Sequence, residues 1–154
     1  MSVPTFKADA AVDDAAAEPY VLEQQIGHLL RKAHQRASAQ FLAHMDAIGL
    51  TPTQYAALVK IGDVGETSQN HLGRLTAMDP ATSQGVIRRL QARGLIELRP
   101  DPDDRRRTLL RLSEAGRQLL PRAIARGRVV TRETLAPLAP GEQATLLALL
   151  QRLT

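Results

Sequence analysis

The sequence predicts a mainly α-helical protein that carries one small β-hairpin. Apolar residues recur every three or four positions over most of the chain from Tyr20 onward, which is the period of a helix. Two short stretches, Leu95–Pro100 and Thr108–Ser113, alternate between apolar and polar residues instead and predict two strands joined by a turn. With 154 residues the chain has the length of one domain and can bury a core of useful size.

The segment from Asp79 to Gly94 predicts a helix with its own start and stop signals. Asp79 can cap the helix N-terminus, Pro80 suits its first position, and Gly94 can adopt the left-handed conformation past its end. At about 100° per residue the apolar side holds Ser83, Val86, Ile87 and Leu90, the opposite side holds Ala81, Gln84, Gly85, Arg88 and Ala92, and Thr82 and Arg89 lie at the edge. Gln and Arg can hydrogen-bond to adenine and guanine edges, so this polar side either reads DNA or is an ordinary solvated face.

The turn between the two predicted strands combines three carboxylates with three arginines. Asp101, Asp103 and Asp104 are followed directly by Arg105, Arg106 and Arg107. Such a run can be a plain solvated loop. At the tip of a two-stranded ribbon, however, planar guanidinium groups also form a probe for phosphates and for a narrow minor groove.

From Tyr20 to the C-terminus the chain resembles the winged-helix multiple-antibiotic-resistance regulator (MarR) family. The resemblance rests on a helix-turn-helix followed by Arg-Gly-Leu-Ile, the hairpin tip at 101–107, and then Leu-Ser-Glu-Ala-Gly. The tip is the most specific element, because the family's Asp-x-Arg pattern matches Asp104 to Arg106. The resemblance implies that Arg106 enters the minor groove of DNA and that Asp104 holds it by a salt bridge. The expected DNA-binding residues are Thr82, Gln84, Arg88, Arg89, Asp104, Arg105 and Arg106.

The two ends of the chain predict a helical dimerisation layer. A helical pattern from Tyr20 to Ile48 is too long to be covered by a small DNA-binding lobe, and the last helix, from Pro140, has an apolar surface too wide for one neighbour. A second copy of the chain would bury both surfaces. We therefore expect a flexible arm at 1–19 and a single winged helix-turn-helix domain at 20–154, with a DNA-binding lobe at 51–112 and dimerisation helices at 20–50 and 113–154.

A candidate ligand site lies on the first long helix and the start of the next. His34 lies in an apolar stripe with Arg31 and Ser38 at its edge, and Tyr55 follows the predicted cap Thr51. These residues can be a buried His and Tyr satisfied by hydrogen bonds, together with a surface Arg. They can also line an apolar cavity and bind the carboxylate or phenol oxygen of an aromatic ligand. The resemblance implies such a cavity, so the expected ligand-binding residues are Arg31, His34, Ser38 and Tyr55.

Charge and residue usage limit the classes of function. The net charge of +4 hides an asymmetry, because residues 1–20 carry −3 and the remainder carries 19 basic and 12 acidic residues. Arginine supplies 17 of the 20 basic residues, which favours phosphate contact or reflects a GC-rich genome. The absence of cysteine excludes disulfides, thiolate catalysis and Cys-based zinc sites. No long apolar run and no signal-peptide pattern occurs, so we expect a cytoplasmic protein without membrane partners.

No catalytic motif is recognisable in the sequence. The four histidines, at 28, 34, 44 and 71, are not spaced with a nucleophile or a metal-ligand set, and no glycine-rich phosphate loop follows a strand. We expect no enzymatic activity, no metal and no cofactor.

These observations together predict a ligand-responsive repressor. We expect a homodimer that binds double-stranded DNA at an inverted-repeat operator and is released by a small aromatic carboxylate or phenol, or by the coenzyme A thioester of the acid. The alternative is a sequence-tolerant architectural DNA-binding protein without a ligand, which the arginine density favours.

Overall fold

The computed structural model describes residues 19–104 and 106–154. The chain forms two compact units, residues 1–33 and 34–154, and each is described by itself. The described part of the first unit contains a short 3-10 helix, η1 (Leu22–Gln24), and the first turns of α1 (Ile26–Met45). Nearly all of the predicted arm at 1–19 lies outside the described residues.

The second unit begins within α1 and continues into η2 (Asp46–Ile48). Gly49 ends this segment in the left-handed conformation with φ 61°. The apolar stripe of the predicted first helix is buried only in its second half, at Phe41, Met45 and Ile48. Ile26 and Leu30, which belong to the same stripe in the first unit, are exposed.

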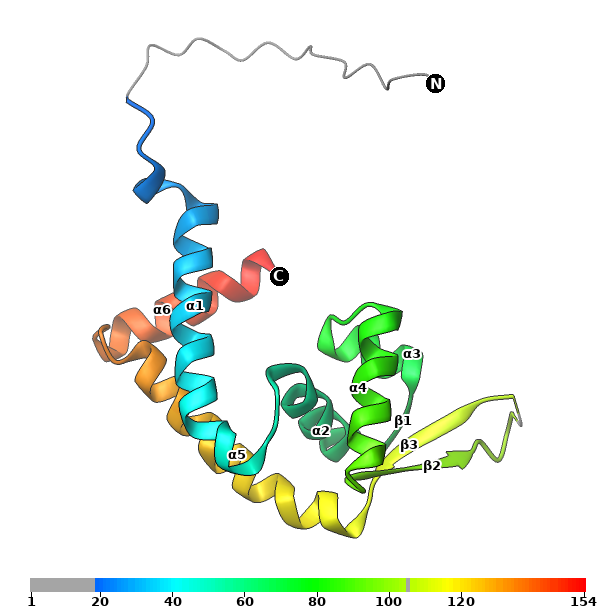
Figure 1. The fold of residues 1–154 in the computed structure, drawn as a ribbon. Helices are drawn as coiled ribbons and strands as arrows, with labels where there is room; N and C mark the ends of the chain where they lie inside the picture. The colour runs from blue at the N-terminus through cyan, green and yellow to red at the C-terminus, as the bar shows by residue number, and fades with distance from the viewer. Residues whose placement is uncertain (1–18, 105) are drawn as a thin grey trace, which may run out of the picture. The chain divides into compact units, whose positions relative to one another are not determined.

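The middle of the chain is a winged helix-turn-helix (Figure 1). Its elements are α2 (Pro52–Val64), β1 (Glu66–Ser68), α3 (Gln69–Thr76), α4 (Pro80–Ala92), β2 (Ile96–Pro100) and β3 (Thr108–Leu112). The hairpin of β2 and β3 extends beyond the helices, and β1 adds to the outer side of β3, so the antiparallel order is β1-β3-β2. β1 was not predicted from the sequence, because a three-residue strand is too short to show alternation.

Side-chain caps begin four of the helices, and those predicted at Thr51 and Asp79 are confirmed. The Thr51 side chain accepts the Gln54 backbone N–H while the Gln54 side chain accepts the Thr51 N–H, a reciprocal capping box. Ser68, Asp79 and Ser113 each accept a backbone N–H three residues further on. Local hydrogen bonding therefore sets where α2, α3, α4 and α5 begin.

The core of the second unit lies beneath α4 and the sheet. All four residues predicted for the inner side of α4 are buried, and Leu58, Ile61, Leu72 and Leu110 join them from α2, α3 and β3. Burying a side chain of this size contributes about 1.5–3 kcal/mol. Small residues let α3 approach α4 closely, because a Cβ on Gly73 would lie 3.0 Å from the Ser83 hydroxyl oxygen.

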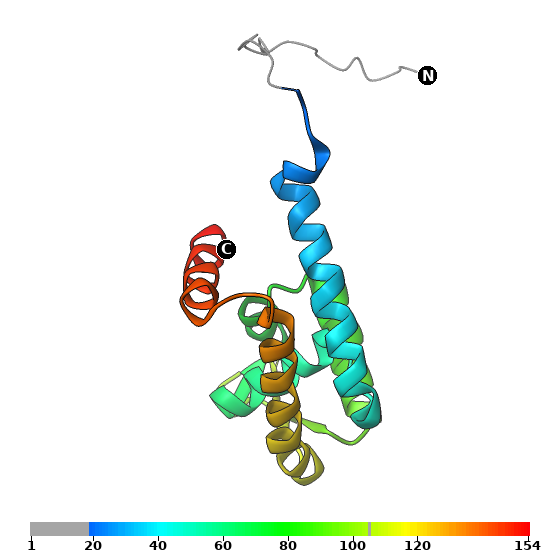
Figure 2. The same cartoon turned by 90° about the vertical axis from the view of Figure 1, so that its left-hand side faces the viewer.

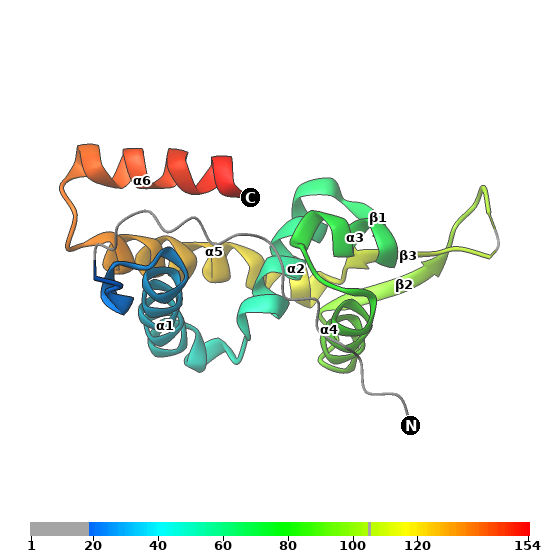
Figure 3. The same ribbon diagram turned by 90° about the horizontal axis from the view of Figure 1, so that it is seen from above.

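Two helices complete the chain, α5 (Glu114–Leu135) and α6 (Pro140–Leu153). Pro121 lies inside α5, which is assigned as one continuous helix. α6 turns back from the end of α5 (Figures 2 and 3) and has no buried residue. Among the described residues, no helix has both the length and the apolar character needed to cross a membrane.

The start of α5 is packed directly against the backbone at the base of the hairpin. The Ser113 N–H donates to the Leu95 carbonyl at 3.1 Å, and the Ser113 hydroxyl donates to the Gly94 carbonyl at 2.5 Å and accepts the Gly116 N–H at 3.0 Å. A Cβ on Gly116 would lie 2.1 Å from the Leu95 carbonyl oxygen. Only glycine therefore permits this approach.

We expect Gly116→Ala to lower the free energy of unfolding by about 1–3 kcal/mol, because backbone on both sides must move to relieve the overlap. Chemical denaturation monitored by circular dichroism measures the change. Gly27→Ala is the matched control, since a Cβ there meets no atom within 4 Å and alanine is the better helix former. Equal stability of Gly116→Ala and the parent would contradict the close packing.

Candidate nucleic-acid interface

The outer face of α4 presents polar side chains that are not engaged with the rest of the protein. Gln84, Arg88 and Arg89 are exposed, and within the described residues none of them forms a side-chain hydrogen bond or an ion pair. The face is otherwise formed by small residues, so a groove wall can approach the helix backbone.

Thr82, which was predicted to contact DNA, is already part of the helix cap. Its hydroxyl donates to Asp79 Oδ2 at 2.5 Å, and its backbone N–H donates to Asp79 Oδ1 at 2.9 Å. These bonds hold the pKa of the Asp79 carboxyl below its usual range. Thr82 is exposed, but its hydroxyl proton is committed, so toward an outside group this hydroxyl acts as an acceptor.

At the wing tip the structure brings Asp104 and Arg106 together. Arg106 Nε lies 3.5 Å from Asp104 Oδ1, and the Arg106 backbone N–H donates to the same oxygen at 3.0 Å. The Arg106 side chain is nevertheless 93% exposed. Asp104 thus orients the arginine while leaving most of its donors free for an outside acceptor. Arg105, the third predicted wing residue, lies outside the described residues.

Asp101, which the sequence analysis did not single out, organises the same turn. It is buried, and its side chain accepts the Asp103 N–H at 2.9 Å and lies 3.7 Å from Arg107 Nε. Its backbone N–H donates to the Arg107 carbonyl at 3.0 Å and closes the loop. Asp at the start of a turn commonly plays this part, and that preference was the available sequence signal.

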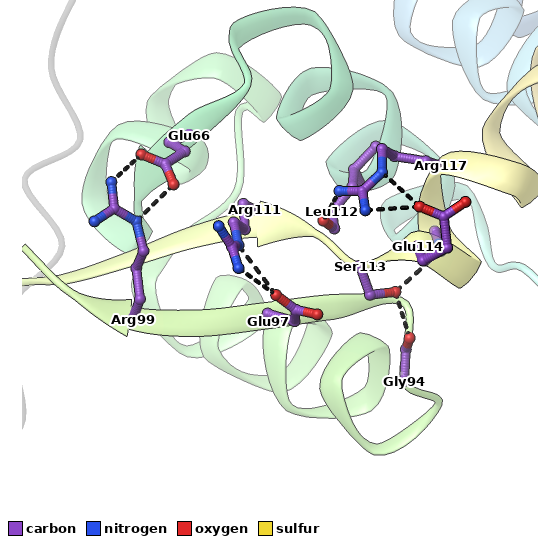
Figure 4. Close-up of polar contacts among 10 residues, drawn as sticks. Glu66, Gly94, Glu97, Arg99, Arg111, Leu112, Ser113, Glu114 and Arg117 are labelled. Atoms are coloured by element: carbon purple, nitrogen blue, oxygen red, sulfur yellow. Dashed lines mark hydrogen bonds and ion pairs between the residues drawn. The ribbon is translucent and has the colours of Figure 1, made fainter.

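Ion pairs stiffen the base of the wing (Figure 4). Arg111 on β3 donates to Glu97 on β2 at 2.9 and 3.0 Å, and Arg99 on β2 reaches across β3 to Glu66 on β1. Hydrogen bonding to Arg99 holds the pKa of the Glu66 carboxyl below its usual range. These pairs join all three strands, although exposed ion pairs are individually weak because water screens them.

Two of the predicted ligand residues, His34 and Ser38, lie close together in the second unit. His34 is exposed rather than buried, and its Nε2 lies 3.4 Å from the Ser38 hydroxyl one helical turn away. Arg31 belongs to the first unit, where Nη2 lies 3.2 Å from His28 Nδ1. His34 and Ser38 therefore form a polar pair on the surface of α1, and the interpretation of His34 as a satisfied core residue is wrong for the single chain.

Tyr55 packs against the core, and its hydroxyl group lies close to the backbone of α5. Its ring meets Phe41 edge-on with centroids 5.8 Å apart, and a Cβ on Gly127 would lie 2.1 Å from its hydroxyl oxygen. Burial raises the pKa of the Tyr55 hydroxyl, and Arg128 partly offsets that rise. Gly127 on α5 therefore makes room for Tyr55.

Comparison with known proteins places this architecture in a family. The MarR family model matches residues 48–107. The transcriptional repressor NicR of Pseudomonas putida is 39% identical over 153 residues, which are 99% of this chain and 95% of NicR. A probable transcriptional regulator from Pseudomonas aeruginosa is 53% identical with a TM-score of 0.84, over 87% of this chain and 100% of that one. BpsR of Bordetella bronchiseptica, whose DNA binding is regulated by 6-hydroxynicotinic acid, is 37% identical with a TM-score of 0.84, over 88% and 97% of the two chains.

The chain belongs to the MarR family. It is therefore a DNA-binding transcriptional regulator, and the predicted winged helix-turn-helix fold is confirmed. The exposed face of α4 and the wing tip are the surfaces of this MarR-family chain that have the chemistry for DNA.

Arg93 is a further residue that the sequence analysis quoted only as part of a motif. From the end of α4 its guanidinium donates to the carbonyl oxygens of Ile48, at 2.9 Å, and of Gly49. These carbonyls end the segment that continues α1, where no intrahelical donor reaches them. Arg93 thus ties the end of the DNA-facing helix to the end of α1.

Two further histidines have hydrogen-bond partners within the chain. His71 Nδ1 lies 3.2 Å from the hydroxyl of buried Thr67, and His44 Nε2 lies 2.7 Å from Glu133 Oε2. In the part of the chain that the structure describes, no group of three or more His, Asp or Glu could hold a metal ion.

We expect Arg106→Ala to weaken DNA binding by about 1–3 kcal/mol without unfolding the protein, because the side chain is almost fully exposed and only loosely paired. Fluorescence anisotropy with labelled DNA measures the affinity, and thermal unfolding checks the fold. Arg122→Ala removes the same charge from exposed α5 as a control. Equal affinity of the Arg106 variant and the parent would remove the wing from the interface.

Proposed function

We propose that the protein is a homodimeric repressor that binds an inverted-repeat operator and is released from it by a small aromatic acid or its coenzyme A thioester. One observation carries the DNA part: Gln84 and Arg88 stand unengaged on α4 while the wing presents Arg106 oriented by Asp104. This pairing suits a helix in the major groove and an arginine in the neighbouring minor groove. Two copies related by a twofold axis would favour an inverted repeat.

The exposed apolar surface of the chain supports a dimer. Leu147, Leu149 and Leu153 on α6 are each at least 45% exposed. A hollow of about 650 Å³ adjoins them, lined by Leu138, Leu146 and Leu149 among others. An apolar surface of this extent is usually covered by a partner protein. A second copy of this chain is the partner that the family's architecture favours.

An aromatic acid as effector is supported by BpsR, which responds to 6-hydroxynicotinic acid. His34 and Ser38 form an exposed polar pair that can hydrogen-bond to a carboxylate or a hydroxyl. Tyr55 has a half-buried ring that packs beside Phe41. The exposed part of the Tyr55 ring suits stacking with an aromatic ligand. A hundredfold preference of the ligand for the arrangement that does not bind DNA supplies about 2.7 kcal/mol of coupling.

The deciding experiment measures binding of the purified protein to DNA from its own upstream region at fixed salt. The titration is repeated with 6-hydroxynicotinic acid and with a panel of hydroxybenzoates and cinnamates. Specific binding that one compound releases supports the proposal. Binding without any site preference would favour the architectural alternative, and specific binding that no compound disturbs would remove the effector.

We expect Gln84→Ala to relax base preference at one position in each operator half-site, because an alanine cannot make the bidentate bonds that an amide makes to adenine. Selection of binding sites from a randomised DNA pool, compared between variant and parent, shows the change. Gln151→Ala, at the exposed end of α6, is the control. An unchanged selected site would move the reading face away from Gln84.

We expect His34→Ala to abolish release of the operator by the effector while leaving operator binding within about twofold, because the side chain is exposed and outside the core. Anisotropy titrations with and without the active compound separate the two effects. His28→Ala is a control on the same helix. Release at the parent's effector concentration would remove His34 from the ligand site.

A further inference from the structure

One ion pair at the base of the wing crosses the whole three-stranded sheet (Figure 4). Glu66, the first residue of β1, is in register with Arg111 of β3, whereas Arg99 of β2 is in register with β3 two residues further toward the wing tip. The pair Glu66–Arg99 is therefore a diagonal contact. It joins the start of β1 to the next-to-last residue of β2, close to where the wing turn begins.

The pair has the geometry of a specific contact. Arg99 Nε donates to Glu66 Oε1 at 2.6 Å and Nη2 donates to Oε2, so the guanidinium and the carboxylate meet through two parallel bonds. The two side chains are 38% and 34% exposed, less than those of the neighbouring pair Arg111–Glu97 at 48% and 50%. Two parallel bonds between planar groups fix the orientation of one strand relative to the other.

Charges of alternating sign continue from this pair into the wing turn. Hydrogen bonding to Glu66 raises the pKa of Arg99, and the nearby carboxylate of Asp101 adds to that rise. Asp101 is buried and lies 3.7 Å from Arg107 Nε. The charged groups in a network of this kind hold one another better than those in isolated surface pairs. The network runs from β1 to the residue that follows Arg106, through Glu66, Arg99, Asp101 and Arg107.

The wing projects from the lobe, and β1 is the part of the sheet that is fixed to the lobe. The hairpin of β2 and β3 extends beyond the helices (Figure 1), and a two-stranded ribbon in water is only marginally stable by itself. In β1, by contrast, Thr67 is buried, and just before the strand the Gly65 N–H donates to the Ile61 carbonyl at the end of α2. Glu66 therefore connects the projecting hairpin to a firmly packed part of the protein.

We propose that Glu66 is a positioning residue for DNA binding, which acts through Arg99 and the wing turn to hold Arg106 where it enters the minor groove. This inference rests on the proposed operator binding and adds a residue that does not itself touch DNA. A carboxylate repels phosphates, so a favourable contribution of Glu66 to DNA affinity has to pass through other residues.

The sign of the effect of Glu66→Gln separates positioning from charge. The variant loses one negative charge, so electrostatics alone would leave DNA binding unchanged or make it tighter. If Glu66 positions the wing, the variant instead binds the operator about fivefold more weakly, because the loosened wing has to be ordered on binding. Fluorescence anisotropy at fixed salt measures the affinity. Equal or tighter binding would overturn the proposal.

Two controls accompany this measurement. Glu23→Gln removes the same charge from an exposed position in the first unit, and we expect it to bind the operator as tightly as the parent does, or more tightly. Thermal unfolding of Glu66→Gln should give the midpoint of the parent, because an exposed ion pair adds little to global stability. Weaker DNA binding by a variant with unchanged stability then reports on the wing.

A double-mutant cycle with Arg106 tests whether the effect passes through the wing tip. We expect Glu66→Gln to cost about fivefold in operator affinity in the parent and close to nothing in Arg106→Ala, because the positioned side chain is then absent. Equal losses in the two backgrounds would mean that Glu66 acts through another part of the protein, and the positioning role would be wrong.

A measurement without DNA separates this inference from the proposed function. NMR relaxation of the Arg106 backbone amide reports its motion on the picosecond-to-nanosecond timescale. We expect Glu66→Gln to lower the order parameter of this amide and to leave those of α4 unchanged. A parent that binds no operator would refute the proposed function. A parent that binds, together with an unchanged order parameter at Arg106 in Glu66→Gln, would refute the positioning role alone.

Discussion

The close approach of α5 to the carbonyl group of Leu95 is the contact on which the arrangement of the second unit depends. Leu95 lies between the end of α4 and the start of β2, so this contact joins the DNA-facing helix, the wing and α5 at one point. Ser113 completes the junction with bonds to two successive carbonyls. A side chain on Gly116 would push these elements apart. The packing of the whole lobe therefore requires glycine at this position.

The junction limits how the lobe can move. α4, β2 and α5 meet at this junction, so none of the three can shift relative to the others without breaking its hydrogen bonds. Arg93 adds a second set of hydrogen bonds, from the end of α4 to the carbonyls of Ile48 and Gly49. The end of α4 is therefore held both by the start of α5 and by the segment that follows α1.

Sequence patterns predicted the elements whose signals are local. The caps at Thr51 and Asp79, the glycine after α4 and the inner face of that helix were all predicted from side-chain chemistry within a few residues. β1 was not predicted, because its three residues carry no strand pattern of their own. They form a strand only because they pair with β3. The roles of Gly116 and Gly127 likewise depend on contacts with distant residues.

In the candidate site, too, local contacts were predicted from the sequence and contacts between distant residues were not. Asp104 and Arg106 are two residues apart, and the structure brings them together as the sequence motif implied. The predicted ligand residues come from α1 and α2, and within the second unit His34 and Ser38, one turn apart, contact each other. Whether residues of two helices line one cavity depends on packing between the helices, which residue spacing does not encode.

Net charge alone says little about the surface that the protein offers to DNA, because several of its arginines already bind groups within the chain. Arg99 and Arg111 bind carboxylates across the strands at the base of the wing, and Arg117 binds Glu114 within α5. Arg93 and Arg126 bind backbone carbonyls and hold helices together. Arg88 and Arg89 on α4 are exposed and form no such bond among the described residues, and Arg106 at the wing tip is 93% exposed beside Asp104. The local placement of such exposed guanidinium groups, rather than the total of +4, decides where a protein can offer an electrostatic surface to DNA.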